Sequence, residues 1–131
     1  MNTSQERILV AAAVVRKNGK TLVCSRPRHS SLTGYYEFPG GKCEPGETPE
    51  LCIVREIKEE LGVLCCPFDR IYTLNHDYPE KKVKVVFIRC FLLSDTLTPL
   101  DNQDIKWVET KNLSGVNFLP ADLPLANMLA E

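Results

Sequence analysis

Hydrophobic residues gather in short runs that are separated by polar turns along most of the chain. Runs of strand length and composition occur at about 7–16, 20–26, 68–78, 83–94 and 104–109. Asn18 and Gly19 separate the first two runs, and an Asn-Gly pair between apolar runs is typical of a tight hairpin turn. The pattern therefore predicts strands over these ranges, with the first two paired as a hairpin.

One segment has its apolar residues at helical spacing. The side chains that share one stripe of a helical wheel are Ile53, Val54, Ile57 and Leu61. Thr48 is suited to the N-cap, Pro49 to the first helical position and Gly62 to the C-terminal stop. A second, shorter helix is predicted near 123–131. Strands combined with few helices indicate an α/β (α+β) fold rather than a long series of βαβ units.

Composition and charge indicate one globular domain that spans residues 1–131. The chain is 44% hydrophobic and 25% charged, which is typical of a globular protein. Its net charge of −1 lacks the basic excess of nucleic-acid and membrane-surface binders, so we expect neither partner. The apolar run 8–15 is followed by a second apolar run and has little net charge before it, which favours a buried strand over an export signal. We therefore expect a cytoplasmic protein.

Six cysteines are present, but no two have C-x-x-C spacing. Without an export signal or paired spacing, the thiols are expected to be reduced and mostly buried.

Three carboxylates lie close together on the predicted helix. Glu56, Glu59 and Glu60 fall on an arc beside the apolar stripe, and their i, i+3 and i, i+4 spacing makes like charges face each other. A solvated acidic face is one explanation. The alternative is a hard-cation site with oxygen ligands, suited to Mg²⁺ with Mn²⁺ as a substitute. We favour the metal site because Lys58, the nearby cation, lies well off this arc.

The loop before this helix carries features of a phosphate site. Gly40 and Gly41 allow close approach of the backbone, Lys42 adds a positive charge, and Pro45-Gly46 fits a type II turn. A metal, a lysine and exposed backbone amides together suit a substrate rich in phosphate. The spacing of a Walker loop is absent.

The complete pattern resembles a known family motif. Gly41, five residues, Glu47, seven residues and then "REIKEELGV" (55–63) resemble the Nudix box. The segments "YEFPGGK", "DIKWV" and "LPADLPL" resemble the MutT-like branch, and among its members the CTP pyrophosphohydrolase-like ones most. This resemblance implies the Nudix fold, a mixed β-sheet sandwiched between α-helices. It also implies Mg²⁺-dependent hydrolysis of a nucleoside diphosphate linked to a further group.

The resemblance also implies a set of metal ligands. Glu56, Glu59 and Glu60 would hold the metal, with the carbonyl of Gly40 as a further ligand. A carboxylate must also take a proton from the attacking water, and we favour Glu56 for this role.

Other residues of the motif are implied to support this site. Arg55 would orient Glu56, and Glu47 would support the loop by pairing with Arg55. Lys42 and Arg26 would face the phosphates.

A carboxylate outside the motif is expected from some relatives, in which a glutamate supplies a ligand or the base. The matching stretch here, "LDNQDIKWV", contains Asp101 and Asp104 but no glutamate. Either aspartate is a candidate.

The base pocket is implied to involve Phe38, which follows Glu37, although Phe38 is equally well explained as a core residue. Asp122 stands where enzymes directed at 8-oxo-guanine have Asn. An ionised Asp only accepts hydrogen bonds, so it suits the N4 amine of cytosine and not O6 of 8-oxo-guanine. We therefore expect cytosine nucleotides (CTP, dCTP and 5-modified dCTP) as substrates. The alternative for Asp122 is an N-cap of the last helix.

The hypothesis is a nucleoside triphosphate pyrophosphohydrolase that releases a nucleoside monophosphate and pyrophosphate, as a monomer or homodimer. The first alternative is an 8-oxo-dGTP diphosphatase. The remote one is a catalytically silent nucleotide sensor, which should have lost Arg55 or a carboxylate of the motif; none is missing.

Overall fold

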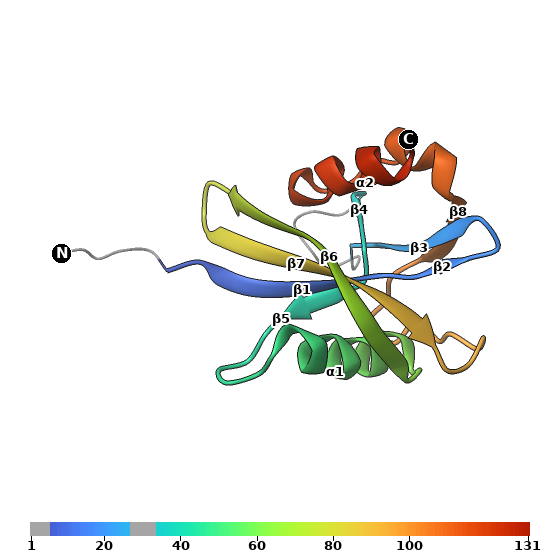
Figure 1. Ribbon diagram of the computed structural model, residues 1–131, viewed down its shortest axis with the longest axis horizontal. Coiled ribbons are helices and arrows are strands. Elements are labelled where there is room, and N and C mark those ends of the chain that lie inside the picture. Colours follow the sequence, from blue (N-terminus) through green and yellow to red (C-terminus); the bar gives the residue numbers. More distant parts are fainter. Residues whose placement is uncertain (1–5, 27–33) are drawn as a thin grey trace.

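A computed structural model describes residues 6–26 and 34–131 (Figure 1). Its elements in chain order are β1 (Ile8–Val14), β2 (Arg16–Lys17), β3 (Lys20–Ser25), β4 (Tyr36–Glu37), β5 (Gly40–Lys42), α1 (Pro49–Leu61), β6 (Cys65–Asp77), β7 (Lys82–Leu92), β8 (Ile105–Glu109), the 3₁₀ turns η1 (Thr110–Gly115) and η2 (Pro120–Asp122), and α2 (Leu123–Leu129).

The strands form two sheets. The larger has the order β5-β1-β7-β6, in which β1 runs parallel to β7 and antiparallel to β5. In the smaller sheet, β3 pairs antiparallel with β2, β4 and β8. The expected mixed-sheet Nudix fold is confirmed, with the correction that the described strands divide into two sheets rather than one.

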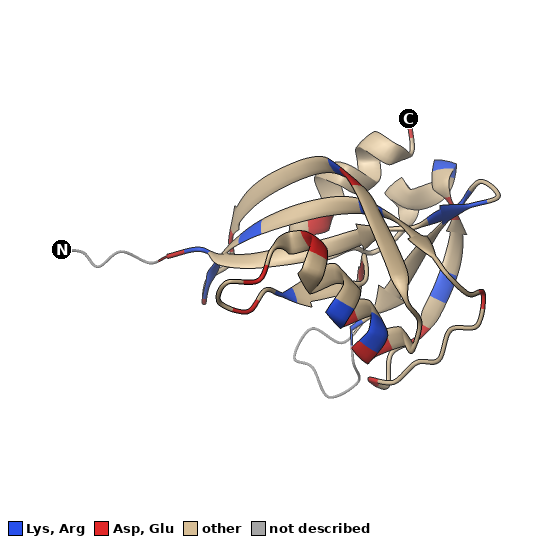
Figure 2. Cartoon of the chain, turned by 60° about the horizontal axis from the view of Figure 1, so that its bottom comes forward, with Lys and Arg blue, Asp and Glu red and all other residues tan. Residues whose placement is uncertain are grey.

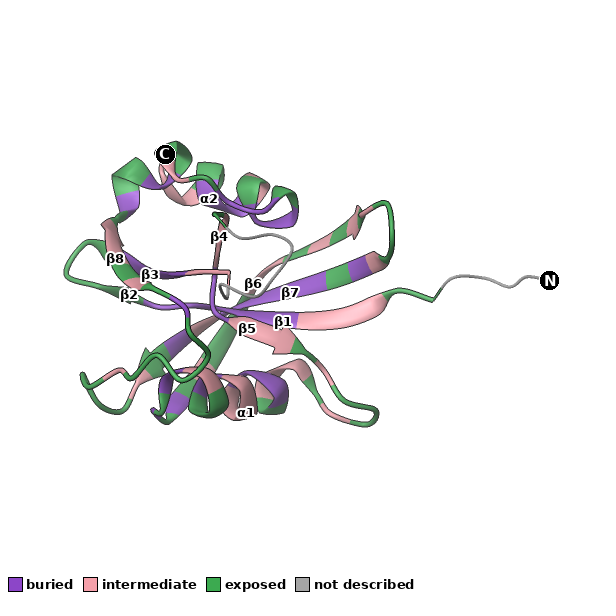
Figure 3. Cartoon of the chain, turned by 180° about the vertical axis from the view of Figure 1, so that it is seen from behind, coloured by how far each residue is buried: buried purple, intermediate pink, exposed green. Residues whose placement is uncertain are grey.

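Helices cover both faces of the larger sheet. Figure 1 shows α1 on one face and α2 on the other, and Figure 3 shows buried residues concentrated where these layers meet. Alternate side chains of β1 point to opposite faces of the sheet. Ala11 and Ala13 pack on the α1 side, whereas Ala12 and Val14 pack on the α2 side. Because both faces of β1 are buried, this strand is a continuous apolar run and not an alternating one.

The predicted hairpin is present between β2 and β3. Asn18 and Gly19 have φ of 54° and 76°, and Lys17 pairs with Lys20 across the turn. Positive φ at both central residues is the geometry for which Asn-Gly is selected. The first apolar run is accordingly a buried strand, as predicted.

The predicted start and end of α1 are also confirmed. The Thr48 hydroxyl accepts a hydrogen bond from the Leu51 N–H at 3.2 Å, and Pro49 occupies the first turn. Gly62 ends the helix at φ 67° and donates its N–H to the Lys58 carbonyl. None of the helices among the described residues is long and apolar enough to cross a membrane.

Two short strands were not predicted from the sequence. β4 and β5 lie in a Gly- and Pro-rich stretch that has no strand pattern of its own. Gly40 can pair with Ala12 because glycine has no Cβ. A Cβ at position 40 would lie 2.0 Å from the Ala11 carbonyl oxygen and would prevent the pairing. Tertiary pairing with β1 therefore makes β5 a strand and brings it beside α1.

Candidate active site

The loop between β5 and α1 is a closed turn. Glu47 donates its N–H to the Glu44 carbonyl at 2.9 Å, and Gly46 has φ of 79°, as the predicted type II turn requires. The side chain of Glu47 accepts the N–H of Glu44 in return, at 2.9 Å. The turn therefore fixes the Glu47 carboxylate beneath the loop, pointing toward α1.

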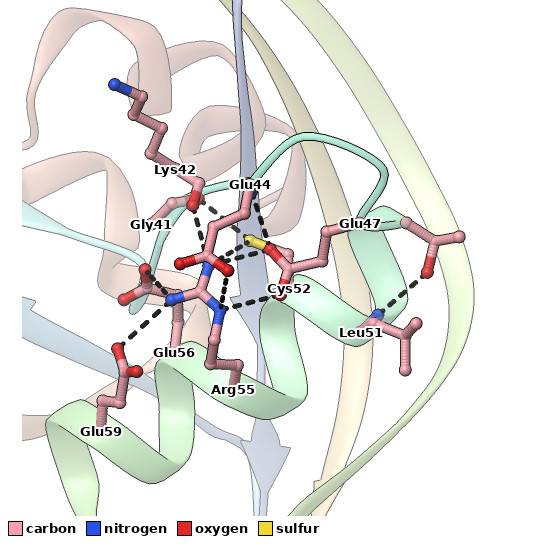
Figure 4. A network of polar contacts seen from close by, with 10 residues as sticks. Gly41, Lys42, Glu44, Glu47, Leu51, Cys52, Arg55, Glu56 and Glu59 are labelled. Atoms are coloured by element: carbon pink, nitrogen blue, oxygen red, sulfur yellow. Dashed lines mark hydrogen bonds and ion pairs between the residues drawn. The ribbon is translucent and has the colours of Figure 1, made fainter.

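Arg55 joins this loop to the helix (Figure 4). Its Nε and Nη2 donate to the two carboxylate oxygens of Glu47 at 2.8 and 2.9 Å, and Nη2 also donates to the Lys42 carbonyl at 3.0 Å. The paired hydrogen bonds lower the pKa of Glu47 to about 2 and raise that of Arg55. This bidentate contact fixes the position of the loop relative to α1.

The remaining nitrogen of Arg55 faces the other carboxylates of α1. Nη1 donates to Glu56 at 3.1 Å and to Glu59 at 3.3 Å. Acidic and basic residues thus lie side by side on this helix (Figure 2). Arg55 thereby holds the Glu56 carboxylate in one orientation.

Glu56 and Glu60 form a pair at the edge of the core. The Glu56 side chain is only 15% exposed, and its carboxylate lies so close to Gly41 that a Cβ there would be 2.4–2.6 Å from its carboxylate atoms. Glu60 is hydrogen-bonded to Glu56. Burial raises the pKa of Glu56, and burial together with the charges of Glu56 and Glu37 raises the pKa of Glu60 to about 9. The pair therefore shares a proton at neutral pH.

The three glutamates do not converge as closely as the helical wheel suggested. In the part of the chain that the structure describes, no three Asp, Glu, His or Cys side chains stand close enough together to enclose an ion. Glu59, whose side chain is 59% exposed, turns instead toward Arg55. The donor set of Glu56 and Glu60 still fits a hard divalent cation, because a cation can replace the proton that the two carboxyl groups share.

The loop that follows β7 packs against the end of α1. Leu100 donates its N–H to the Glu60 carbonyl at 2.9 Å, and the side-chain amide of Gln103 donates to the same carbonyl at 3.2 Å. The Gln103 amide oxygen accepts the N–H of Asp101 at 2.9 Å. The charge of Asp101 contributes to the raised pKa of Glu60, whereas the N–H of Asp104 bonds to Ser25 on β3. The charge of Asp101 therefore acts on Glu60, and which aspartate supplies a further carboxylate stays a prediction.

Sequence reasoning missed Gln103, which is only 6% exposed. Replacing it by Leu is expected to lower the free energy of unfolding by about 1–2 kcal/mol, because the N–H of Asp101 and the carbonyl of Glu60 each lose a hydrogen-bond partner. Urea unfolding measures this loss, and the same variant should show a reduced kcat. An unchanged unfolding midpoint would show that the loop is held by other contacts.

A cavity of about 550 Å³ opens on the α2 side of the larger sheet, with Gly40, Gly41 and Lys42 along one wall. Phe38 lines it and is also a core residue, stacked on Phe118 with ring centres 5.0 Å apart, so the core interpretation is confirmed and the contact with a base stays a prediction. Other residues that line it are Arg26, Glu37, Tyr78, Lys81, Leu119, Ala121 and Asp122.

Arg26 and Glu37 form a half-buried pair in the wall of this cavity. Nη1 of Arg26 contacts both carboxylate oxygens of Glu37 at 3.1 Å. Burial raises the pKa of Glu37, while the guanidinium opposes that rise. The negative charge of Glu37 therefore largely balances the positive charge that Arg26 presents to the cavity.

Asp122 is buried in the wall of the cavity. Its Oδ2 accepts the N–H of Phe38 at 3.1 Å. Asp122 occupies the N-cap position of α2, as the alternative interpretation predicted, but its side chain makes no capping hydrogen bond there. Burial and the charge of Glu37 raise its pKa to about 8. The raised pKa means that Asp122 exists in both its neutral and its ionised form around pH 8, so its role as an acceptor only stays a prediction. Desolvation by the surrounding core is the main cause of the raised pKa.

The sequence profile of the NUDIX domain matches residues 6–131 of the chain. The chain belongs to the Nudix family. This Nudix chain is a hydrolase that acts on acid anhydrides, and members of the family use divalent metal ions.

Individual Nudix proteins are similar over nearly the whole length. The chain is 32% identical to a CTP pyrophosphohydrolase of Escherichia coli K12, over 90% of this chain and 87% of that protein. It is 31% identical to an 8-oxo-dGTP diphosphatase of Haemophilus influenzae, over 93% and 90%. The solution structure of the MutT protein of methicillin-resistant Staphylococcus aureus 252 superimposes with a TM-score of 0.78, at 31% identity over 97% and 98% of the two chains.

Proposed function

We propose that this Nudix hydrolase is a Mg²⁺-dependent nucleoside triphosphate pyrophosphohydrolase that prefers cytosine nucleotides. Water attacks a phosphorus atom of the triphosphate, the bond between the α- and β-phosphates breaks, and a nucleoside monophosphate and pyrophosphate leave. Mn²⁺ is expected to substitute for Mg²⁺. We expect the enzyme to be a monomer or a homodimer.

The observation that carries the proposal is that one cavity connects the loop of the Nudix box with Asp122. Gly40, Gly41 and Lys42 form part of its wall, and Glu56 lies directly against Gly41. A nucleotide with its base beside Asp122 would therefore have its phosphates beside the carboxylates of α1. Similarity to a CTP pyrophosphohydrolase supports the same substrate class.

Each site residue has a role in this proposal. The metal would be held by Glu56, Glu60 and the Gly40 carbonyl, and by Glu59 once its side chain turns from Arg55 toward the other two carboxylates. When bound, it would neutralise phosphate charge and lower the pKa of bound water. Glu56 takes the proton of the attacking water, because Arg55 holds its carboxylate beside the loop.

Positively charged side chains and the loop support the phosphates. Lys42, which lines the cavity, faces the phosphate groups together with Arg26. Glu47 keeps the loop and helix in place through Arg55. Asp101 is proposed as the further carboxylate near Glu60, because its charge contributes to the raised pKa of Glu60.

The protonation of Asp122 decides between the two candidate bases. Because Oδ2 is occupied by the Phe38 N–H, only Oδ1 can meet the base. A cytosine N4 amine requires an acceptor, which the ionised form supplies, whereas O6 of 8-oxo-guanine requires the protonated form as a donor. Similarity to an 8-oxo-dGTP diphosphatase and the raised pKa of Asp122 keep oxidised guanine as the second candidate.

Product binding should therefore depend on pH in opposite directions for the two bases. With a pKa of about 8 for Asp122, binding of dCMP is expected to tighten as pH rises from 6.5 to 9, and binding of 8-oxo-dGMP to weaken. Calorimetric titration of each monophosphate measures this. Asp122→Asn is the control, because an amide does not titrate and should abolish both trends. Weaker dCMP binding at high pH would contradict the cytosine assignment.

Turnover on CTP, dCTP, 5-methyl-dCTP, dGTP and 8-oxo-dGTP tests the reaction itself. Pyrophosphate and phosphate are assayed separately with Mg²⁺ present. Pyrophosphate released from the cytosine compounds is the expected result. Preference for 8-oxo-dGTP would retain the chemistry and overturn the base assignment, and no metal-dependent turnover would favour the silent sensor.

A further inference from the structure

Tyr78 connects two walls of the cavity. It lies at the turn between β6 and β7, where its N–H and carbonyl pair with those of Lys81. Its phenol oxygen accepts the N–H of Ala121 at 3.2 Å, across the cavity in η2. This contact ties the turn to the residue immediately before Asp122.

The hydroxyl proton of Tyr78 remains available. A phenol has one proton to donate, and the bond to Ala121 uses only the oxygen as acceptor. Among residues 6–26 and 34–131 no acceptor for this proton is found. The ring is packed against His76, with centres 4.5 Å apart, so the hydroxyl stays at the cavity wall.

We propose that Tyr78 is a specificity-determining residue whose hydroxyl donates to N3 of the cytosine ring while Asp122 accepts from the N4 amine. This inference rests on the proposed binding of the base in this cavity. N3 and the N4 amine are adjacent on the edge of cytosine. The Tyr78 hydroxyl, a donor, and the Asp122 carboxylate, an acceptor, are neighbours on the cavity wall, because Tyr78 is bonded to Ala121. Uracil presents N3–H and O4 instead, so it would face a donor with a donor and an acceptor with an acceptor.

Comparison of CTP with 3-deaza-CTP, which lacks the ring acceptor, isolates this hydrogen bond. For the unaltered protein, KM for 3-deaza-CTP should exceed KM for CTP by about tenfold. A change of this size corresponds to the usual contribution of one hydrogen bond to the binding free energy. In Tyr78→Phe, KM for CTP should rise about tenfold, the two KM values should become equal, and kcat should stay within about twofold. The preference for CTP over UTP should fall by a similar factor.

The ratio of KM for 3-deaza-CTP to KM for CTP distinguishes recognition of the base by Tyr78 from a purely structural role of this residue. If Tyr78 only held η2 in place, Tyr78→Phe would weaken both substrates equally and leave their ratio unchanged, which would overturn the inference. Tyr72→Phe is the matched control, because Tyr72 packs on Phe87 and does not line the cavity. It should leave all of these constants unaltered.

Failure of the proposed function would look different. In that case the unaltered protein would not hydrolyse CTP, and Tyr78→Phe would be measured on 8-oxo-dGTP, whose O6 has two lone pairs and would accept from Tyr78 as well as from protonated Asp122. A raised KM there would support donation by Tyr78, and an unchanged KM would overturn it.

Discussion

Replacing Glu60 by Gln is expected to lower kcat about a thousandfold, because a metal-binding anion contributes several kcal/mol to the transition state. The fold should remain intact. Glu60 holds a proton at neutral pH, with a pKa of about 9, and is hydrogen-bonded to Glu56. Gln has the same shape and the same lack of charge as that protonated form, so the unfolding midpoint without metal should not change.

Metal binding provides a second measurement for this variant. Mn²⁺ should raise the unfolding temperature of the unaltered protein and fail to do so for Glu60→Gln, because a ligand that binds only the folded state stabilises it. Glu50→Gln is the matched control on the same helix, where Glu50 pairs with Arg70 and lies away from the site. Normal turnover by Glu60→Gln would remove Glu60 from the set of ligands.

Replacing Gly41 by Ala is expected to lower kcat about a hundredfold through displacement of the Glu56 carboxylate, since a shift of about 1 Å can cost that much. The new Cβ would lie 2.4–2.6 Å from the carboxylate atoms of Glu56, so this side chain must turn away. It would then leave both Arg55 and Glu60. The backbone of Gly41 does not have positive φ, so Ala fits the conformation and the protein should fold.

Two other glycines provide controls for this substitution. Gly115→Ala places a Cβ where no atom lies within 4 Å, so neither activity nor stability should change. Gly40→Ala places it 2.0 Å from a backbone oxygen of β1, so it should unfold the protein at much lower urea concentration. Full activity of Gly41→Ala would show that the position of Glu56 against the loop does not matter.

Local sequence patterns were sufficient for the long elements and for the motif. The hairpin at Asn18–Gly19 and the ends of α1 at Thr48 and Gly62 depend on backbone conformations that a few adjacent residues determine. The spacing of the Nudix box likewise placed Arg55 and Glu56 on one helix beside their loop. Family membership followed from the same spacing, and the match over residues 6–131 confirmed it.

Elements with no local pattern could not be predicted. β5 is three residues long and exists because Gly40 and Gly41 fit against β1, which lies about 30 residues earlier. Gln103 is a polar residue in a loop, which from the sequence predicts exposure. Its side chain is nevertheless buried and donates to the Glu60 carbonyl, 43 residues earlier in the chain. Such contacts depend on which segments the fold brings together.

The sequence by itself determined the family, the main helices and strands, and the residues that can carry the chemistry, because these depend on spacing along the chain. Only the tertiary structure decided how burial shifts the pKa values of Asp122 and Glu60, the position of Tyr78 beside Ala121, and the cavity that joins Tyr78 and Asp122 to the loop of the motif. Protonation of a carboxyl group depends on how much water its neighbours exclude and which charges they bring near. Those neighbours come from distant parts of the chain, so the donors and acceptors that a base would meet are set by packing.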